Sequence, residues 1–550
     1  MEGIADFLDS IIGGVDLICY SLAVGGLIWG LFVVKPWGNV DWQNSDKQDQ
    51  ALYILTERAI RLIYQGAFAL VIVQLLKILL KIWLMDSILE RWPFPEFAST
   101  TQFIGGIIRL SLAMALAVFV YYVLHSNANS RQHWFYAAAI ALLMIISGAW
   151  LVHAAGRFDD RVLLMSLTTV HQVAAATWVG GVFQLVSIWQ LTRQKQIPDS
   201  YWPASLKRFS RVGMIAVAGI LASGTPMALG YITTWNGFIG TGYGNILLVK
   251  ILLLAIALGF AWLNRSAVLE YYSANKQGVF SRVPYYIEAE TFVLITLLFT
   301  AASLASQPPA IDIPGLTATW GEVLHSFAPR IPRTTSPSHA ALLAGEAGRM
   351  AIIGQTPSAA ATAWSDYNHN IAGIFVTVMS LFAMLSYKKS LTWTRYWPVG
   401  FIGLGIFILL RADAETWPNG TMGFWESMLK NGEIFQHRIA TLLVFLLGGM
   451  ELRARMTSDP ESKLPYVFPI LCAFGGLMLL THSHIGFQAK SSFLIQIGHT
   501  FMGLFALIMA IGRWLELKLD SPGKNIAGFI SVFAFFQIGL ILIFYREPLY

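Results

Sequence analysis

The sequence predicts an all-α, polytopic membrane protein with about fourteen transmembrane helices. Of its 550 residues, 56% are hydrophobic and only 12% are charged, and the mean hydropathy is +0.59. Apolar segments recur from one end of the chain to the other, and most are close to the roughly 20 residues that a helix needs to cross a bilayer. Backbone polar groups in lipid must pair within their own segment, so segments of this length are helices and not barrel strands.

The predicted spans differ in length, and the span over 396–410 is the shortest. The opening MEGIADFLDS is acidic and lacks the positive region of a signal peptide, so we expect the first span to be retained. Both cysteines, Cys19 and Cys472, fall within predicted spans, so no disulfide framework is expected. The predicted spans cover residues 12–36, 60–85, 103–125, 134–156, 164–190, 211–235, 245–264, 286–306, 367–387, 396–410, 434–450, 466–481, 493–515 and 525–544.

Lys and Arg gather in alternate connections between these spans, and such residues in short loops mark the cytoplasmic side. The connection over 191–211 is basic, for example, whereas the next one, NGFIGTGYG (236–244), carries no charge. With fourteen spans the alternation is regular and places both termini on the outer, non-cytoplasmic side of the membrane. The partner implied is the lipid bilayer. Without a basic run of sufficient length, no nucleic acid partner is expected.

One connection is much longer than the others and divides the chain. Residues 307–366 are rich in Pro, Ser and Ala, and a connection of this length is usually functional or flexible. We therefore predict an eight-span membrane domain over 1–310, a long periplasmic connection over 311–366 and a six-span membrane domain over 367–550.

The histidines are distributed unevenly across the predicted membrane. Nine of the eleven fall on the outer side in this topology, and only His125 and His133 are cytoplasmic. Imidazole is a common metal ligand, and polar groups within spans usually face the bundle interior for a functional reason. His153 and His171 stand at the outer ends of consecutive spans joined by a short turn, so we predict that they share one metal site.

A second group of histidines centres on the stretch THSHIGFQAKSSFLIQIGHT (481–500). It contains His482, His484 and His499, and the predicted outer ends of two other helices add His437 and His369. Ligands from different helices commonly converge in bundles, so we predict a second outer metal site. His482 and His484 are two residues apart and converge only if the helix unwinds, which Ile485-Gly486 favours.

The residues leave the identity of the bound group open. Histidine with nearby methionine suits copper best, with zinc or nickel behind it. Two histidines from facing helices also bind b-type haem, and His171 and His499 are placed deeply enough for that role. A structural reading remains for each histidine, as an interfacial side chain hydrogen-bonded to backbone or water.

Several ordered motifs resemble the copper resistance D (CopD) family of bacterial inner-membrane proteins. In the first half they are LVHAAG (151–156), HQVAAATWVGG (171–181), KRFSRVGMIAVAGILASG (207–224) and YGNILLVKILLLAIALGFAWLNR (243–265), closed by SLASQPPA (303–310). The second half is similar to the extension of longer members through YNHNIAGIF (367–375), RADAETWPNGTMGFWES (411–427), FQHRIA (435–440), THSH (481–484) and GHTFMGLFALIMAIGRWLEL (498–517). The resemblance implies copper handling together with a separate periplasmic CopC-like copper-binding protein.

The sequence thus predicts an inner-membrane copper transport protein that takes up copper from the periplasm and is not an enzyme. It contains neither a phosphate-binding G-x-x-x-x-G-K-[ST] motif nor a phosphorylatable D-K-T-G, so ATP-driven transport is not expected. Two alternatives stay open: a haem b electron-transfer protein, and a copper sensor or scaffold that does not transport.

Overall fold

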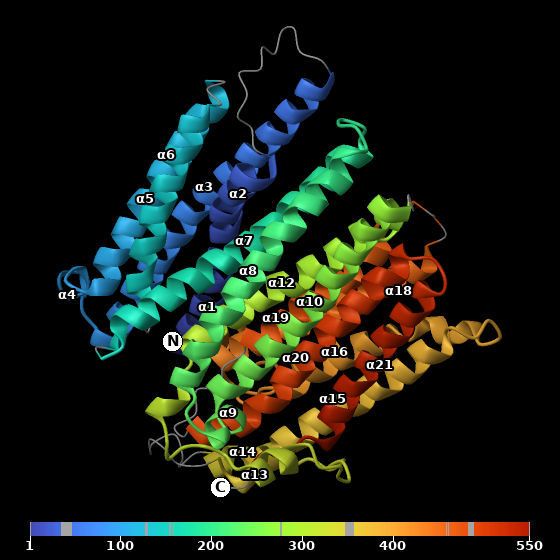
Figure 1. The fold of residues 1–550 in the computed structure, drawn as a ribbon. Coiled ribbons are helices and arrows are strands. Elements are labelled where there is room, and N and C mark those ends of the chain that lie inside the picture. Colours follow the sequence, from blue (N-terminus) through green and yellow to red (C-terminus); the bar gives the residue numbers. More distant parts are fainter. Residues whose placement is uncertain are drawn as a thin grey trace. The chain divides into compact units, whose positions relative to one another are not determined.

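Every regular element that the computed structural model describes is a helix (Figure 1). The described residues are 2–34, 47–126, 130–152, 156–157, 159–274, 278–346, 357–457, 459, 461–481 and 489–548. They form two compact units. The N-terminal unit comprises Ile11–Tyr231 and Leu254–Ala305, and the C-terminal unit comprises Met1–Ser10, Ile232–Leu253 and Ser306–Tyr550. The division of the chain into three segments at residues 310 and 366, made from the sequence, remains a prediction.

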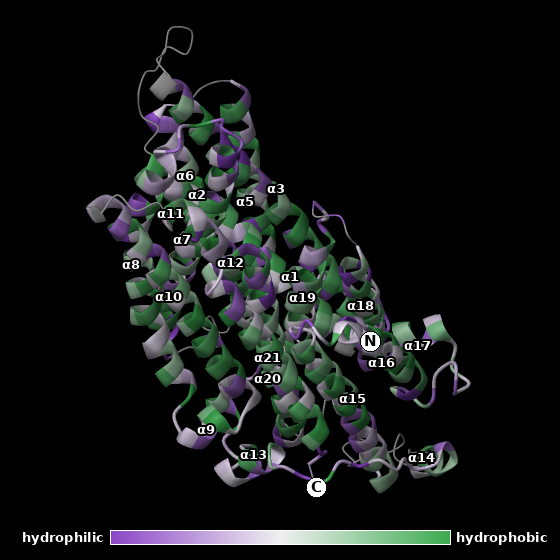
Figure 2. Ribbon diagram, turned by 90° about the vertical axis from the view of Figure 1, so that its right-hand side faces the viewer, coloured by the Kyte–Doolittle hydropathy of each residue, from purple (hydrophilic) through white to green (hydrophobic). Residues whose placement is uncertain are grey.

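The long helices confirm an all-α polytopic membrane protein. Within the described ranges, thirteen helices are long and apolar enough to cross a membrane. A fourteenth long helix, α18 (Gly432–Met456), corresponds to the predicted span 434–450 but is more polar, because Gln436, His437 and Arg438 interrupt its apolar sequence. Hydrophobic residues follow the long helices (Figure 2). Ile215 and Phe529 leave 76% and 66% of their surface exposed, as expected for side chains that face lipid.

The N-terminal unit is built around the first membrane helix, in which α-helical and π-helical turns alternate. Its core joins this helix to α3, α5 and α6 through Ala, Leu, Ile and Val side chains. The elements are α1 (Glu2–Tyr20), η1 (Ser21–Gly25), α2 (Gly26–Trp29), η2 (Gly30–Val34), α3 (Lys47–Leu89), α4 (Phe94–Ala98), α5 (Thr101–His125), α6 (Arg131–Gly148), η3 (Ala149–Leu151), α7 (Arg161–Arg193), α8 (Tyr201–Tyr231), α10 (Gly242–Ala274), α11 (Gly278–Ser281) and α12 (Val283–Ser306). Both α1 and α10 have one end in each unit.

Small residues allow two helices of this unit to approach each other closely. A side chain added at Gly180 of α7 would overlap the backbone of Ser21 and Gly25, and one added at Gly25 would overlap Ala176. Such approaches are typical of membrane helices, where small residues bring backbones into van der Waals contact.

The C-terminal unit is centred on α20, which lies against both α19 and α21. Its elements are α9 (Trp235–Ile239), η5 (Ala310–Asp312), α13 (Trp320–Ser326), α14 (His339–Glu346), α15 (Ala359–Leu385), η7 (Thr392–Tyr396), α16 (Val399–Arg411), α17 (Phe424–Lys430), α18, η8 (Leu464–Tyr466), α19 (Val467–Thr481), α20 (Ala489–Lys518) and α21 (Gly523–Phe544). Phe7 of α1 packs edge to face on Phe435 of α18 at 6.2 Å. The first residues of the chain therefore lie at the end of the unit where α18 begins.

The described part of the long connection, up to Glu346, lies against this unit. Val323 of α13 packs on Phe493 and Ile497 of α20, and the Lys490 ammonium pairs with the Glu322 carboxylate at 2.7 Å. Farther along, the His339 ring hydrogen-bonds to the Ala414 carbonyl at 2.6 Å. The connection therefore contacts the ends of α15, α16 and α20 that lie nearest the predicted histidine site.

Candidate metal centre

Two of the predicted ligands, His369 and His499, meet in the C-terminal unit. His369 lies ten residues after the first residue of α15, and His499 lies ten residues after the first residue of α20. Their ring centroids are 5.5 Å apart at an interplanar angle of 82°. A metal ion bonds to imidazole nitrogen at about 2 Å, so two rings this close can share one ion.

Both rings are oriented by hydrogen bonds to the preceding turn of their own helix. His369 Nδ1 lies 2.9 Å from the Ser365 carbonyl oxygen, and His499 Nδ1 lies 3.2 Å from that of Ile495. In a neutral imidazole this bond requires the proton on Nδ1, which leaves the lone pair on Nε2. The same arrangement orients histidine ligands in metalloproteins. The two helices therefore present the pair in the tautomer that binds metal.

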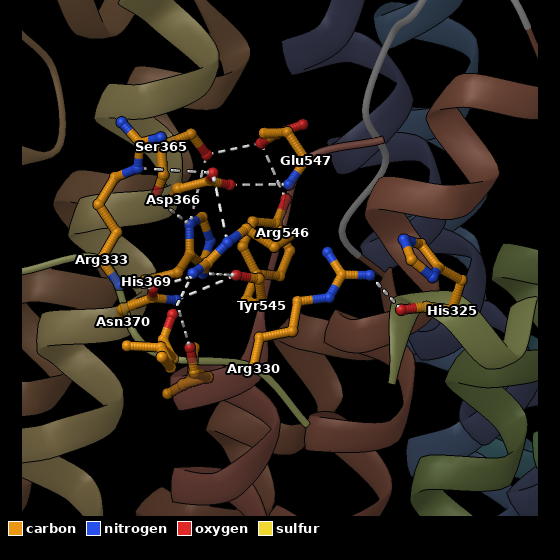
Figure 3. A network of polar contacts seen from close by, with 12 residues as sticks. His325, Arg330, Arg333, Ser365, Asp366, His369, Asn370, Tyr545, Arg546 and Glu547 are labelled. Atoms are coloured by element: carbon orange, nitrogen blue, oxygen red, sulfur yellow. Dashed lines mark hydrogen bonds and ion pairs between the residues drawn. The ribbon is translucent and has the colours of Figure 1, made fainter. Parts of the chain in front are cut away.

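Tyr545 closes one side of the pair. Its ring stacks on that of His369 at 3.9 Å and meets that of His499 edge to face at 6.1 Å. The Tyr545 hydroxyl donates to Glu547 Oε1 at 2.9 Å, and Ser365 Oγ donates to the same oxygen at 2.6 Å. Burial raises the pKa of the Glu547 carboxyl. The residues after α21 thus fix the tyrosine on His369 (Figure 3).

Asn370, the neighbour of His369, anchors this C-terminal segment. Its side chain is fully buried. Its Nδ2 donates to the carbonyls of Leu542 and Tyr545 at 3.1 and 3.0 Å, and its Oδ1 accepts from Arg333 N and from Arg546 Nη1. Figure 3 shows how the segment around Arg333, α15 and the residues after α21 converge at this point.

His437 belongs to a neighbouring pair with a carboxylate. Its Nδ1 lies 2.8 Å from Asp413 Oδ1, and Asp413 is almost entirely buried. The next residue, Arg438, donates to Thr416 Oγ1 at 2.7 Å and to the Trp417 carbonyl at 2.8 Å, which holds the 411–423 connection on α18.

Three predicted ligands, His153, His482 and His484, lie outside the described residues. The chain connects His482 and His484 to the first residue of α20, the helix that carries His499. Over the described ranges, no group of three or more His, Cys, Asp or Glu side chains is arranged to hold a metal ion. The described part of the centre is therefore the pair formed by His369 and His499.

His171 stands apart from this pair, on α7 of the N-terminal unit. Its Nδ1 lies 3.1 Å from Ser223 Oγ on α8, and that hydroxyl lies 2.6 Å from the Gly219 carbonyl. One turn earlier on α7, Thr168 Oγ1 approaches the sulfur of Met227 to 3.3 Å. The facing surfaces of α7 and α8 therefore bring an imidazole and a thioether into one neighbourhood.

The sequence reasoning missed two features of these sites. Tyr545 and the anchoring by Asn370 carry no signal in spacing or residue type, because the contacts join residues more than 170 positions apart. The second is a contact of Trp178, whose indole N–H donates at 2.8 Å to the buried Glu290 carboxylate of another helix.

The sequence of this chain matches known proteins over part of its length. Residues 203–304 match the family model described as "Copper resistance protein D". The chain is 27% identical over 205 residues to the copper transport protein CutJ of Bacillus subtilis (strain 168), which is 37% of this chain and 36% of that protein. It is 30% identical over 137 residues to the inner membrane protein YebZ of Escherichia coli (strain K12), which is 24% of this chain and 46% of that protein.

These matches cover only part of this chain and part of each relative. The chain spans less than half the length of either curated relative, and no solved structure matches it. The family segment contains Ser223, Met227 and Glu290, whereas His171, His369 and His499 lie outside it.

Proposed function

From the premise that this chain is a multi-pass protein of the bacterial inner membrane and belongs to the copper resistance protein D family, we propose that it transports copper across that membrane and captures the ion at His369 and His499. The observation that carries this proposal is the pairing of the two rings at 5.5 Å, each with its Nδ1 bonded to a carbonyl of its own helix. Both Nε2 lone pairs are then available in the neutral tautomer that metal binding requires. Copper is the cargo of this site and not a resident cofactor.

The remaining predicted histidines complete the proposed capture site. Two imidazoles leave coordination positions for further ligands, and His482 and His484 are tethered to the helix of His499. His437, which is paired with Asp413 near the start of α18, would serve as a neighbouring or transfer ligand. Imidazole ligands suit copper in either common oxidation state.

A second copper position is proposed in the N-terminal unit. His171 and Met227 project from facing helices, and His153 would join them from the connection before α7. A thioether beside an imidazole favours Cu(I) over harder ions. This position would be an intermediate copper-binding site between α7 and α8. Met227 lies inside the segment that matches the family model, and His171 lies before it.

The orientation and the partner follow from the loop charges and the family. With both termini periplasmic, His369 and His499 face the periplasm, and transport runs inward as uptake. A periplasmic CopC-like copper-binding protein would deliver the ion. The chain is proposed to act as a transporter without catalysing a reaction.

Copper stoichiometry in purified protein tests the capture site. We expect the double variant H369A/H499A to lose about one copper per chain, and H482A/H484A to lose the same ion because the four ligands share it. His125→Ala is the matched control: its Nδ1 makes the same kind of bond to a carbonyl one turn earlier, at 2.9 Å, but it lies on α5 of the other unit. Unchanged copper content in H369A/H499A would refute the site.

The absorption spectrum of the same sample separates the haem alternative. A haem held by the two histidines gives a Soret band that disappears in H369A/H499A. Copper without a Soret band supports the transport proposal, and a Soret band at one haem per chain would replace it with electron transfer. A protein that binds copper but moves none into vesicles would be the sensor or scaffold.

A further inference from the structure

A buried carboxyl group in the N-terminal unit is held only by neutral donors. Glu290 lies two turns into α12 and is 2% exposed. Trp178 Nε1 of α7 donates to its Oε1 at 2.8 Å, and Asn264 Nδ2 of α10 donates to its Oε2 at 2.8 Å. Both donor side chains are themselves buried. Three membrane helices thus converge on one carboxyl group.

The charged side chains of the surrounding helices are engaged elsewhere or lie far along their helices. Asp16 of α1 pairs with Arg109 at 2.9 Å, and Arg265 of α10 donates to Ser210 on α8 at 3.0 Å. Arg193 lies fifteen residues beyond Trp178 on α7. Glu288, two residues before Glu290, points about 200° away around the helix. Among the described residues, the hydrogen-bond partners of the Glu290 carboxyl group are the side chains of Trp178 and Asn264.

The site suits a protonated carboxyl group better than an ionised one. An ionised carboxylate without a cationic partner is costly to bury, and ionisable groups within membrane spans usually mark ion or proton pathways. The Asn264 Oδ1 atom is buried and has no hydrogen-bond partner in the described structure. Rotating this amide would place Oδ1 where Nδ2 now stands, so that it accepts the proton carried by Oε2 while Trp178 still donates to Oε1.

We propose that Glu290 is a membrane-embedded proton-binding site, with Trp178 and Asn264 as its positioning residues. The step moves one proton only: the Oε2–H bond breaks, its electron pair stays on the carboxylate, a water molecule takes the proton, and the Asn264 amide turns from acceptor to donor. Coupling of this exchange to copper movement rests on the proposed transport function, but the proton site itself does not.

Infrared difference spectroscopy of the purified full chain, without copper, tests the proton site. Wild type at neutral pH should show the C=O stretching band of a protonated carboxyl group. The band should be absent in E290Q, retained in the matched control E288Q and shifted in frequency in E290D, where a shorter side chain changes both hydrogen bonds. A band of unchanged intensity in E290Q, or an unshifted band in E290D, would overturn the proposal, and E290D keeps the test valid if E290Q does not fold.

Copper uptake into proteoliposomes then tests the coupling, with CuCl as the probe under reducing conditions. A gradient of one pH unit supplies up to about tenfold driving force per proton, so uptake by wild type and E288Q should change several-fold with the gradient and uptake by E290Q should not. Uptake that ignores the gradient in wild type overturns the coupling. If wild type takes up no copper but still shows the infrared band, copper transport is refuted and the proposal of a proton-binding site is retained.

Discussion

Replacing Asn370 by alanine would release the segment that holds Tyr545 on His369. The buried amide makes four hydrogen bonds: it donates to the Leu542 and Tyr545 carbonyls and accepts from Arg333 N and Arg546 Nη1. Alanine removes all four and leaves the two carbonyls to find other donors. The C-terminal segment should therefore open locally while the helices on either side stay folded.

The size of the effect follows from the bonds that are lost. A hydrogen bond contributes about 0.5–1.5 kcal/mol net, so four set a range of about 2–6 kcal/mol. We expect the lower part, about 2–3 kcal/mol, because Arg546 keeps its own bond to the Tyr545 carbonyl at 2.7 Å. At about 1.4 kcal/mol per factor of ten, the open population should rise by about 30- to 150-fold.

Hydrogen–deuterium exchange measures this opening. The Glu547 amide, which donates to Asp366 Oδ1 at 2.8 Å, is the reporter. Ser386→Ala is the control, since it removes one hydrogen bond, Oγ to the Ala383 carbonyl, at the opposite end of α15. The Asn370 variant should also bind copper more weakly than the Ser386 variant. Protection at Glu547 that stays within about threefold of wild type would show that Asn370 does not anchor the segment.

Two further predictions concern the ion pair of the connection and the close helix contact. The bond from Lys490 lowers the pKa of the Glu322 carboxyl to about 2, so the pair stabilises the folded state above the ordinary pKa of about 4.3 and loses this contribution as pH falls from there toward 2. Because the pair is exposed, E322Q should lower the unfolding free energy at pH 7 by less than about 1 kcal/mol and flatten its pH dependence between pH 5 and 3; an unchanged pH profile would refute this. Gly180→Ala should lower the melting temperature by several degrees, whereas Gly259→Ala, which meets open space, should not; equal effects would contradict the packing argument.

The fold class was predictable because each helix that crosses the bilayer needs a continuous apolar segment of about 20 residues, which is visible in the sequence. Thirteen of the predicted spans coincide with helices apolar enough to cross a bilayer, and even the short segment 396–410 lies within the candidate span Thr392–Arg411. The exception in hydropathy, α18, still forms its helix. Its polar residues are accommodated by partners such as Arg513, which reaches the fully buried Glu451 at 3.4 Å. The hydropathy of a segment reflects the unfavourable burial of a charged side chain, but it does not reveal the partner that compensates the charge in the folded structure.

The candidate site was predictable in its residue types and only partly in its geometry. Convergence of His369 and His499 could be inferred because both lie near the same predicted end of their helices. The position of His437 could not, because its carboxylate partner Asp413 comes from a connection whose path no periodicity encodes. No spacing in the sequence points to the surroundings of Glu290 either, since only the tertiary structure brings Trp178 and Asn264 to it.

One helix carries a contact beside each of the two proposed sites. Asn245 of α10 donates at 2.9 Å to Thr500, the residue after His499, and nineteen residues later Asn264 of α10 bonds to Glu290. Both asparagines belong to the same continuous helix (Figure 1). If copper binding shifts α20, α10 can transmit the shift to the amide that holds the proton. We expect copper to change the carboxyl infrared band in wild type and to change it much less in Asn245→Ala, which keeps all proposed ligands and Glu290 itself. An equal copper-induced change in both proteins would show that α10 does not connect the sites.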